Sequence, residues 1–250
     1  MKEITIAILK IFFTKGVTGI WDNKKNLSLY FKTLFWTYRN KDIRFSISYL
    51  FRIKIPNTDS YLLVFNRRIE NQLQPVGGVY KRYGDDKLFE KWDYHPDHNG
   101  NGLGTDEIST GDLRFKVKGK NVIDVIKWFE EGKEREVSSE REFNEELIET
   151  KILDKDTFQK IKYKHIKRVS KNLKWSEHHT CFEVLIYDIM ELLPTREQAD
   201  ALVKLSANKF NKEMGYAVVD FNDISQLRFV DKGKQLARIG EHTKLTINQN

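Results

Sequence analysis

Apolar side chains recur at helical spacing within residues 1–42. This spacing predicts two amphipathic helices, one within residues 4–13 and one within residues 27–38. The stripes consist of Ile4, Ile8, Ile11 and Phe12, and of Leu27, Tyr30, Phe31, Leu34 and Phe35. We expect an N-terminal helical extension that docks on the main domain or pairs between subunits. A membrane-surface role is less favoured, because such helices usually carry a more uniformly basic polar face.

From residue 43 onward the pattern changes to short apolar or alternating runs separated by turns, which is typical of strands with interspersed helices. Strands are predicted at 46–55, 61–65, 75–80, 112–118, 161–173, 180–190 and 216–221, and helices at 122–131, 141–148 and 195–207. A polar tail is expected after Gly240. These elements predict an α/β (α+β) domain over residues 43–250, with its least regular part, an insertion, at about 84–133.

Composition narrows the class of protein. A chain of 250 residues with 40% apolar residues can fill a sizeable core. Its net charge of +7 favours anionic partners, although 36 acidic residues are mixed among 43 basic ones. The single cysteine, Cys181, excludes an intrachain disulfide and argues against a cysteine-based zinc site. No apolar run approaches the length of about 20 residues that a membrane span needs, so a soluble, cytoplasmic protein is expected.

The predicted helix at 141–148 carries three carboxylates. Glu142, Glu145 and Glu146 are spaced i, i+3 and i+4, so they share one face, and Arg141 lies four residues before Glu145. A cluster of hard oxygen donors suits Mg²⁺ or Mn²⁺. Two alternatives remain open from the residues alone. The face could simply be solvated, or Ser139 and Glu142 could form a capping box.

Other residues indicate binding of phosphate or base groups. Gly77 and Gly78 enter a strand and allow the close approach of another strand or of a ligand. Seven basic residues without an acid lie along one predicted strand region: Lys160, Lys162, Lys164, Lys167, Arg168, Lys171 and Lys174. They suit phosphate contacts such as those of Lys164 and Arg168, or they protect a sheet edge. Tyr80 and Trp175 are candidates to stack on bases.

The Pro-Val-Gly-Gly strand entry followed by Arg-Glu-Phe-Asn-Glu-Glu on a helix resembles the Nudix superfamily. The resemblance implies an α/β/α sandwich around a mixed sheet. It makes Arg141 the conserved arginine of the family's motif, and Glu142, Glu145 and Glu146 its metal-binding and catalytic glutamates. The chain departs from the motif in three places. More than fifty residues separate Gly78 from Arg141, the position of the upstream glutamate falls on Lys133 with Glu134 one place off register, and Ile148 replaces the closing glycine.

Within that superfamily, roughly residues 43–245 resemble the SMODS-associated Nudix family. The similar segments are 49–53, 61–64, 74–80, 112–114 and 141–148. The resemblance implies a domain that senses or processes a cyclic oligonucleotide made by a bacterial nucleotidyltransferase in antiphage (CBASS) signalling. An alternative hypothesis is a Mg²⁺-dependent hydrolase of nucleoside diphosphate derivatives. A third, from composition alone, is a general nucleic-acid-binding protein.

Overall fold

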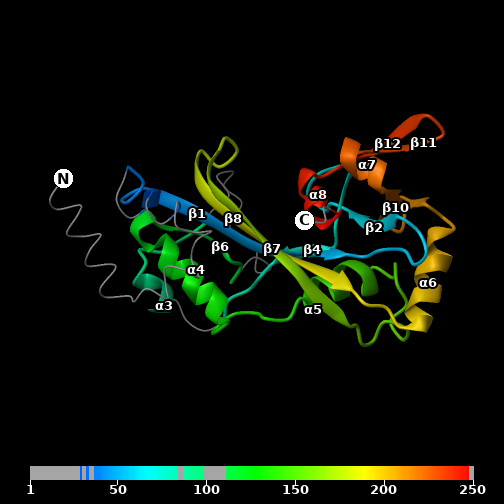
Figure 1. The fold of residues 1–250 in the computed structure, drawn as a ribbon, viewed down its shortest axis with the longest axis horizontal. Coiled ribbons are helices and arrows are strands. Elements are labelled where there is room, and N and C mark those ends of the chain that lie inside the picture. Colours follow the sequence, from blue (N-terminus) through cyan, green and yellow to red (C-terminus); the bar gives the residue numbers. More distant parts are fainter. Residues whose placement is uncertain (1–28, 30–31, 34–36, 84–86, 98–110, 248–250) are drawn as a thin grey trace.

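The computed structural model describes residues 29, 32–33, 37–83, 87–97 and 111–247, in which the strands form two mixed sheets flanked by helices (Figure 1). The first sheet has the order β5-β6-β1-β8-β7, with β4 also paired to β1. The second has the order β11-β12-β3-β2-β10-β9.

The central strand of the first sheet is β1, Asp42–Arg52. It pairs in parallel with β8, Cys181–Leu192, and β8 pairs antiparallel with the edge strand β7, Tyr163–Ser176. On its other side, the first half of β1 pairs with β6, Arg114–Lys118, and its second half with β4, Gly77–Val79. The short β5, His95–Pro96, extends the sheet beyond β6. Two separate segments therefore share one edge of β1.

Alternation along β1 determines which of its residues reach the core. Ile43, Phe45, Ile47, Tyr49 and Phe51 are at most 1% exposed and belong to the main core. The intervening positions are mostly polar, since side chains alternate between the two faces of a strand. The polar face of β1 forms the floor of a cleft between the two sheets.

The second sheet contains β2 (Ser60–Phe65), β3 (Gln72–Gln74), β9 (Phe210–Asn211), β10 (Tyr216–Asp220), β11 (Arg228–Asp231) and β12 (Lys234–Ile239). Alternation again separates two faces. Leu62 and Val218 pack into the main core, whereas Leu63 and Val219 pack into a second core that includes Ile224 and Ile247. The sheet therefore joins two cores.

Helix boundaries follow local signals. Helix α4, Val122–Glu131, ends at Gly132, which adopts a left-handed conformation with φ of 70°. Helix α6, Arg196–Ser206, begins at a capping box formed by Thr195 and Gln198. The remaining helical segments are α3 (Lys87–Glu90), η2 (Gly119–Asn121), α5 (Glu140–Phe143), η3 (Asn144–Ile148), α7 (Phe221–Gln226), η4 (Glu241–Thr243) and α8 (Lys244–Ile247).

The predicted mixed α/β class is confirmed. The division of the strands into two sheets was not predicted. The prediction of a polar tail after Gly240 is wrong for residues 241–247. These residues form η4 and α8, in which Thr243, Thr246 and Ile247 are buried.

The two N-terminal helices fall mostly outside the described residues. The helix at 4–13 lies entirely outside them, and of the helix at 27–38 the structure describes residues 29, 32–33 and 37–38, of which Leu29, Lys32 and Thr33 are helical. Leu29 is 2% exposed and belongs to the main core. Within the described part of the chain, no helix has the length and apolar character needed to cross a membrane.

Candidate functional site

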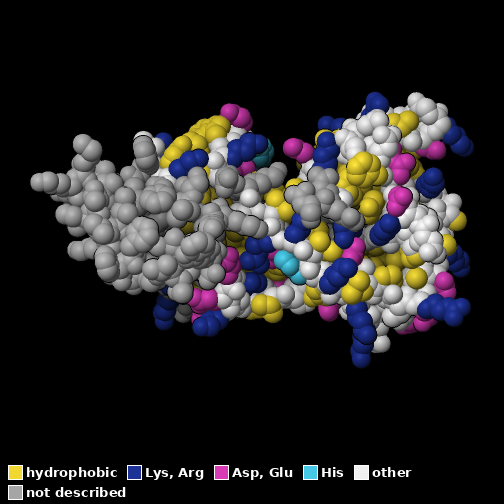
Figure 2. All heavy atoms as spheres, in the orientation of Figure 1, with side chains coloured by type: hydrophobic (Ala, Val, Ile, Leu, Met, Phe, Trp, Pro, Cys, Tyr) yellow, Lys and Arg dark blue, Asp and Glu magenta, His cyan; other side chains and the backbone are white. Residues whose placement is uncertain are grey.

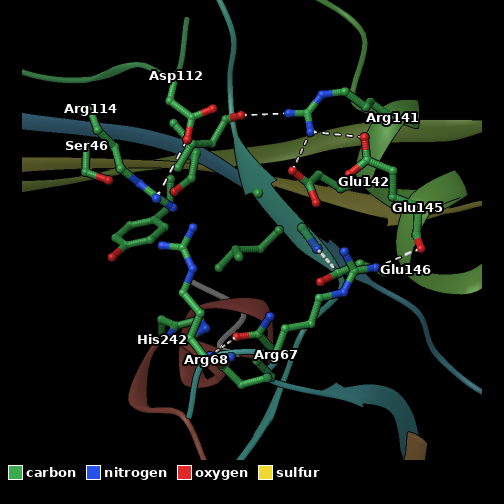
Figure 3. A pocket seen from close by; sticks show the side chains of 18 residues that line it. Ser46, Arg67, Arg68, Asp112, Arg114, Arg141, Glu142, Glu145, Glu146 and His242 are labelled. Carbon is green, nitrogen blue, oxygen red and sulfur yellow. Dashed lines mark hydrogen bonds and ion pairs between the residues drawn. The ribbon is translucent and has the colours of Figure 1, made fainter. Parts of the chain in front are cut away.

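A polar cleft of about 340 Å³ lies between the two sheets, beside the carboxylate helix (Figure 3). This volume is within the range of small-molecule sites. The cleft brings together Arg141, the three glutamates and the glycine pair, which the sequence predicts as site residues. Its lining consists of Ser46, Ser48, Leu50, Asn66, Arg67, Arg68, Gln74, Gly77, Gly78, Val79, Asp112, Arg114, Arg141, Glu142, Glu145, Glu146, Tyr187 and His242.

The carboxylate helix changes its winding where the glutamates lie. Helix α5 is followed directly by π-helical turns, η3, with a hydrogen bond from the Glu149 N–H to the Asn144 carbonyl. Such turns are rare in proteins, and those that occur are often located at functional sites. The N-cap residue, Ser139, makes no side-chain capping hydrogen bond, and the Glu142 carboxylate accepts from Arg141 instead. The predicted alternative of a capping box is therefore wrong.

Arg141 is the centre of an ion-pair network. Its Nη1 donates to Glu142 Oε1 at 2.6 Å, its Nε to Glu136 Oε1 at 3.1 Å, and its Nη2 to the Val79 carbonyl at 2.8 Å. Its Nη1 also lies 3.5 Å from Glu145 Oε1, as the i, i+4 spacing predicts. Burial alone would lower the pKa of Arg141, but the hydrogen bond to Glu136 and the surrounding carboxylates raise it overall. Arg141 therefore stays charged and fixes the helix against β4.

Glu136 is a site residue that the sequence analysis missed. Glu136 is 5% exposed, and its carboxylate accepts hydrogen bonds from both Arg141 and the Lys81 N–H. The motif's spacing falls on Lys133, with Glu134 one place off register, because the chain before the helix does not keep the register of the motif. The useful signal was the other glutamate of the same segment, five residues before Arg141.

Glu146 is the most buried of the three glutamates, at 7% exposure. Its Oε2 accepts a hydrogen bond from the Gly77 N–H at 3.0 Å. Burial raises the pKa of Glu146 to about 7, and the charges of Glu142 and Glu145 act in the same direction. A cation between these groups would relieve the repulsion.

The donor set fits a hard divalent cation, since carboxylate oxygens are the ligands that Mg²⁺ and Mn²⁺ prefer. The chain's own charges also fit, because Glu142, Glu145 and Glu146 together carry more negative charge than Arg141 offsets. Among the described residues, however, no three acidic, histidine or cysteine side chains are already gathered at metal-binding distances. In this arrangement the Glu142 carboxylate is paired with the Arg141 guanidinium.

The other candidate binding residues lie away from this cleft. Tyr80 is 2% exposed, and its hydroxyl donates to Asp188 at 3.0 Å, so its ring has no open face for a base. Arg168 makes two hydrogen bonds to the same Asp188, at 2.7 and 2.9 Å. The structure places both residues in a structural network rather than in the cleft.

The basic residues of β7 lie on a sheet edge. Lys164 pairs with Glu191 at 2.7 Å, and Trp175 packs edge-on against Phe182 while remaining 43% exposed. Figure 2 shows basic, acidic and apolar side chains interspersed over the visible described face. These observations favour the alternative of a protected edge over a continuous phosphate-binding ribbon.

The glycine pair has two different physical roles. A Cβ at Gly77, whose φ is 153°, would collide with the backbone carbonyl of Tyr49, so only glycine fits beside β1. A Cβ at Gly78 would occupy the place of the Glu142 carboxylate. The missing side chain of Gly78 therefore leaves space for the flexible Glu142 side chain, not for another backbone segment.

We expect Gly78→Ala to fold but to displace the Glu142 carboxylate from Arg141. Its free energy of unfolding should change by less than about 1 kcal/mol, since a side chain rather than backbone must move. Stabilisation by Mg²⁺, measured by thermal unfolding, should weaken. The control is Glu142→Gln. Adding Gly78→Ala to this variant should not weaken the stabilisation by Mg²⁺ further, because both changes act through the Glu142 carboxylate. Additive losses would show that Gly78 acts independently of Glu142.

Comparison with known proteins identifies one family. The family model described as the SMODS-associated NUDIX domain matches residues 42–247. No curated protein and no solved structure matches the chain.

Proposed function

The chain belongs to the SMODS-associated NUDIX domain family, and we propose that it senses or processes a cyclic oligonucleotide in bacterial antiviral defence. The family supports a Nudix-type, nucleotide-related function. The observation that carries the proposal is the cleft, which joins the motif's arginine and glutamates to three further arginines, Arg67, Arg68 and Arg114. A cleft with both signs of charge suits a phosphate-bearing ligand, either directly through arginines or through a cation on the carboxylates.

Within this proposal each part of the cleft has a role. Nudix domains generally use a divalent metal such as Mg²⁺, and Glu142, Glu145 and Glu146 would hold it. When bound, such a cation neutralises phosphate charge. Arg141 keeps the helix positioned on β4, and Gly77 fixes the Glu146 carboxylate through its N–H. The polar face of β1, with Ser46 and Ser48, forms the floor.

The alternative function is hydrolysis of a nucleoside diphosphate derivative. The observation in its favour is the burial of Glu146 in the cleft beside Glu142 and Glu145, because a divalent cation held by these carboxylates would activate water for attack on a diphosphate. The two functions differ in the fate of the ligand, which sensing leaves unchanged and hydrolysis cleaves.

The partners proposed with this function are a signal-making nucleotidyltransferase and a second copy of the chain. The second copy would pair through the predicted helices of residues 1–42. A cytoplasmic location is proposed together with these partners.

Thermal unfolding with a panel of cyclic di- and trinucleotides tests sensing. We expect one of them to raise the melting temperature. At one hundred times its Kd, the free energy of unfolding should rise by about 2.7 kcal/mol. Chromatography of the same samples should recover the nucleotide intact. Cleavage that requires Mg²⁺ would favour the hydrolase, and the absence of any shift across the panel would contradict sensing.

A further inference from the structure

The cleft has a basic wall opposite the carboxylate helix. Arg68 lies in the turn after β2, and Arg114 begins β6, so the two arginines come from different sheets. Figure 3 shows Arg68 extending toward the Arg114 guanidinium, with Glu142, Glu145 and Glu146 on the opposite side of the cleft.

Arg114 is a partly buried cation whose ion pair with Asp112 is long. Its side chain is 32% exposed, and its Nη1 lies 3.7 Å from Asp112 Oδ2, beyond hydrogen-bond distance. Burial lowers the pKa of Arg114, and the positive charge of Arg68 adds to this effect although Asp112 opposes it. A negatively charged group at this position would therefore stabilise the charged form of Arg114.

Arg68 lies in a turn that the Asn66 side chain holds by hydrogen bonds. The Asn66 side-chain oxygen accepts from the N–H groups of Arg68 and Ile69 at 2.7 and 2.9 Å, and its Nδ2 donates to Gln74 at 2.6 Å. The turn is therefore tied to β3, while Arg68 itself remains exposed. Its neighbour Arg67 turns the other way and donates to the Glu145 carbonyl at 2.9 Å. Of this pair, Arg68 is thus the residue that faces Arg114.

The geometry points to a second anion subsite, in which Arg68 and Arg114 together bind one phosphate of the ligand. This subsite rests on the proposed function and deepens it: the ligand would place another phosphate at the carboxylate helix. Two guanidinium groups that face each other repel, and a phosphate between them accepts hydrogen bonds from both. The ligand class is therefore a nucleotide with at least two phosphates, such as a cyclic dinucleotide, rather than a nucleoside monophosphate.

Inorganic phosphate in EDTA is the probe for this subsite, because it requires no metal at the carboxylates. Thermal unfolding is compared in phosphate and in chloride at equal ionic strength. We expect phosphate to stabilise the wild type, and Arg68→Gln to raise the apparent Kd for phosphate about tenfold or more, because the charged hydrogen bonds of one guanidinium are lost. Arg68→Lys should retain part of the affinity, because lysine keeps the charge without the planar fork.

The matched control is Arg228→Gln, which removes an exposed arginine of β11 whose Nε donates to the nearby Gln226. It should behave as the wild type. Without phosphate, Arg68→Gln should melt no lower than the wild type, because Arg68 is exposed and its charge repels that of Arg114. No phosphate shift in the wild type, or equal shifts in the wild type and Arg68→Gln, would overturn the subsite.

The same variants separate this inference from the proposed function. If a cyclic dinucleotide binds the wild type and Arg68→Gln equally well, the subsite is wrong and the nucleotide function stands. If phosphate binding depends on Arg68 but no cyclic nucleotide or diphosphate binds, the subsite stands and the proposed function fails.

Discussion

Asp188→Ala should lower the free energy of unfolding by about 3–5 kcal/mol, the cost of breaking a buried ion pair by removing one partner. Asp188 lies on β8 with 3% exposure. It accepts two hydrogen bonds from Arg168, one from the buried Tyr80 hydroxyl, and contacts His165 Nε2 at 3.2 Å. Alanine would leave all three partners without their acceptor. In a chain of this size the loss corresponds to a fall in melting temperature of roughly 10 °C.

The pH dependence has a definite sign. Burial alone would raise the pKa of Asp188, but the hydrogen bonds and charge of Arg168 hold it below its usual value. Because the folded-state pKa is depressed, the contribution is present above the unfolded-state pKa of about 3.9 and is lost as the pH falls through the folded-state value. The difference in melting temperature between the wild type and Asp188→Ala should therefore shrink as the pH falls from neutral toward 3.

Two controls accompany this measurement. Asp42→Asn removes one partner of the exposed pair with Lys118, at 2.7 Å, and should cost less than about 1 kcal/mol. Asp188→Asn keeps an oxygen acceptor for Tyr80 and should cost less than Asp188→Ala. A loss below about 1 kcal/mol for Asp188→Ala would contradict the structural role of the network, and would return Arg168 to the set of ligand-binding candidates.

Local signals were sufficient to predict individual elements. Helix α4 has the predicted bounds because its apolar spacing ends at Gly132, a left-handed C-cap. Helix α6 begins beside the predicted cap, Thr195. The motif glutamates and the glycine pair also line one cleft, because Arg141 connects α5 to the Val79 carbonyl of β4.

Contacts between distant segments could not be predicted in this way. The basic wall depends on Arg68 and Arg114 being brought together from two sheets, and no spacing along the chain encodes that meeting. Tyr80 lies two residues after Gly78, yet it packs beside Tyr49 and Phe129, with ring centroids 4.8 and 5.4 Å away. Its aromatic character was evident from the sequence, but its burial depends on β1 and α4.

Glu146→Gln should have two opposite effects: it should stabilise the metal-free protein at pH 8 and weaken the response to Mg²⁺. The folded-state pKa of Glu146 is raised from 4.5 to about 7, because its carboxylate is buried beside Glu142 and Glu145. For an acid with a raised folded-state pKa, its contribution to stability is fully present below the unfolded-state pKa. The contribution is lost as the pH rises from that value through the folded-state pKa, above which the loss is complete. Glutamine resembles the protonated acid and avoids this loss.

The gain in unfolding free energy at pH 8 should reach up to about 3 kcal/mol and should vanish near pH 4.5. It is measured by denaturant unfolding in EDTA at several pH values. Glu140→Gln is the matched control, because Glu140 is an exposed glutamate of the same helix and does not line the cleft. It should change the stability by only a few tenths of a kcal/mol at either pH.

The second half of the prediction concerns Mg²⁺. Titration of Mg²⁺ during thermal unfolding at pH 8 should stabilise the wild type, and Glu145→Gln combined with Glu146→Gln should abolish that stabilisation. Any Mg²⁺-dependent cleavage of a nucleotide should fall by about 100-fold or more in the same double variant, because two charged oxygen ligands are lost. A residue that only supports the fold would lose stability when substituted, and it would have no selective effect on the metal response. A variant with greater metal-free stability and no response to Mg²⁺ would therefore identify these carboxylates as a cation site, whereas an unchanged response would exclude them.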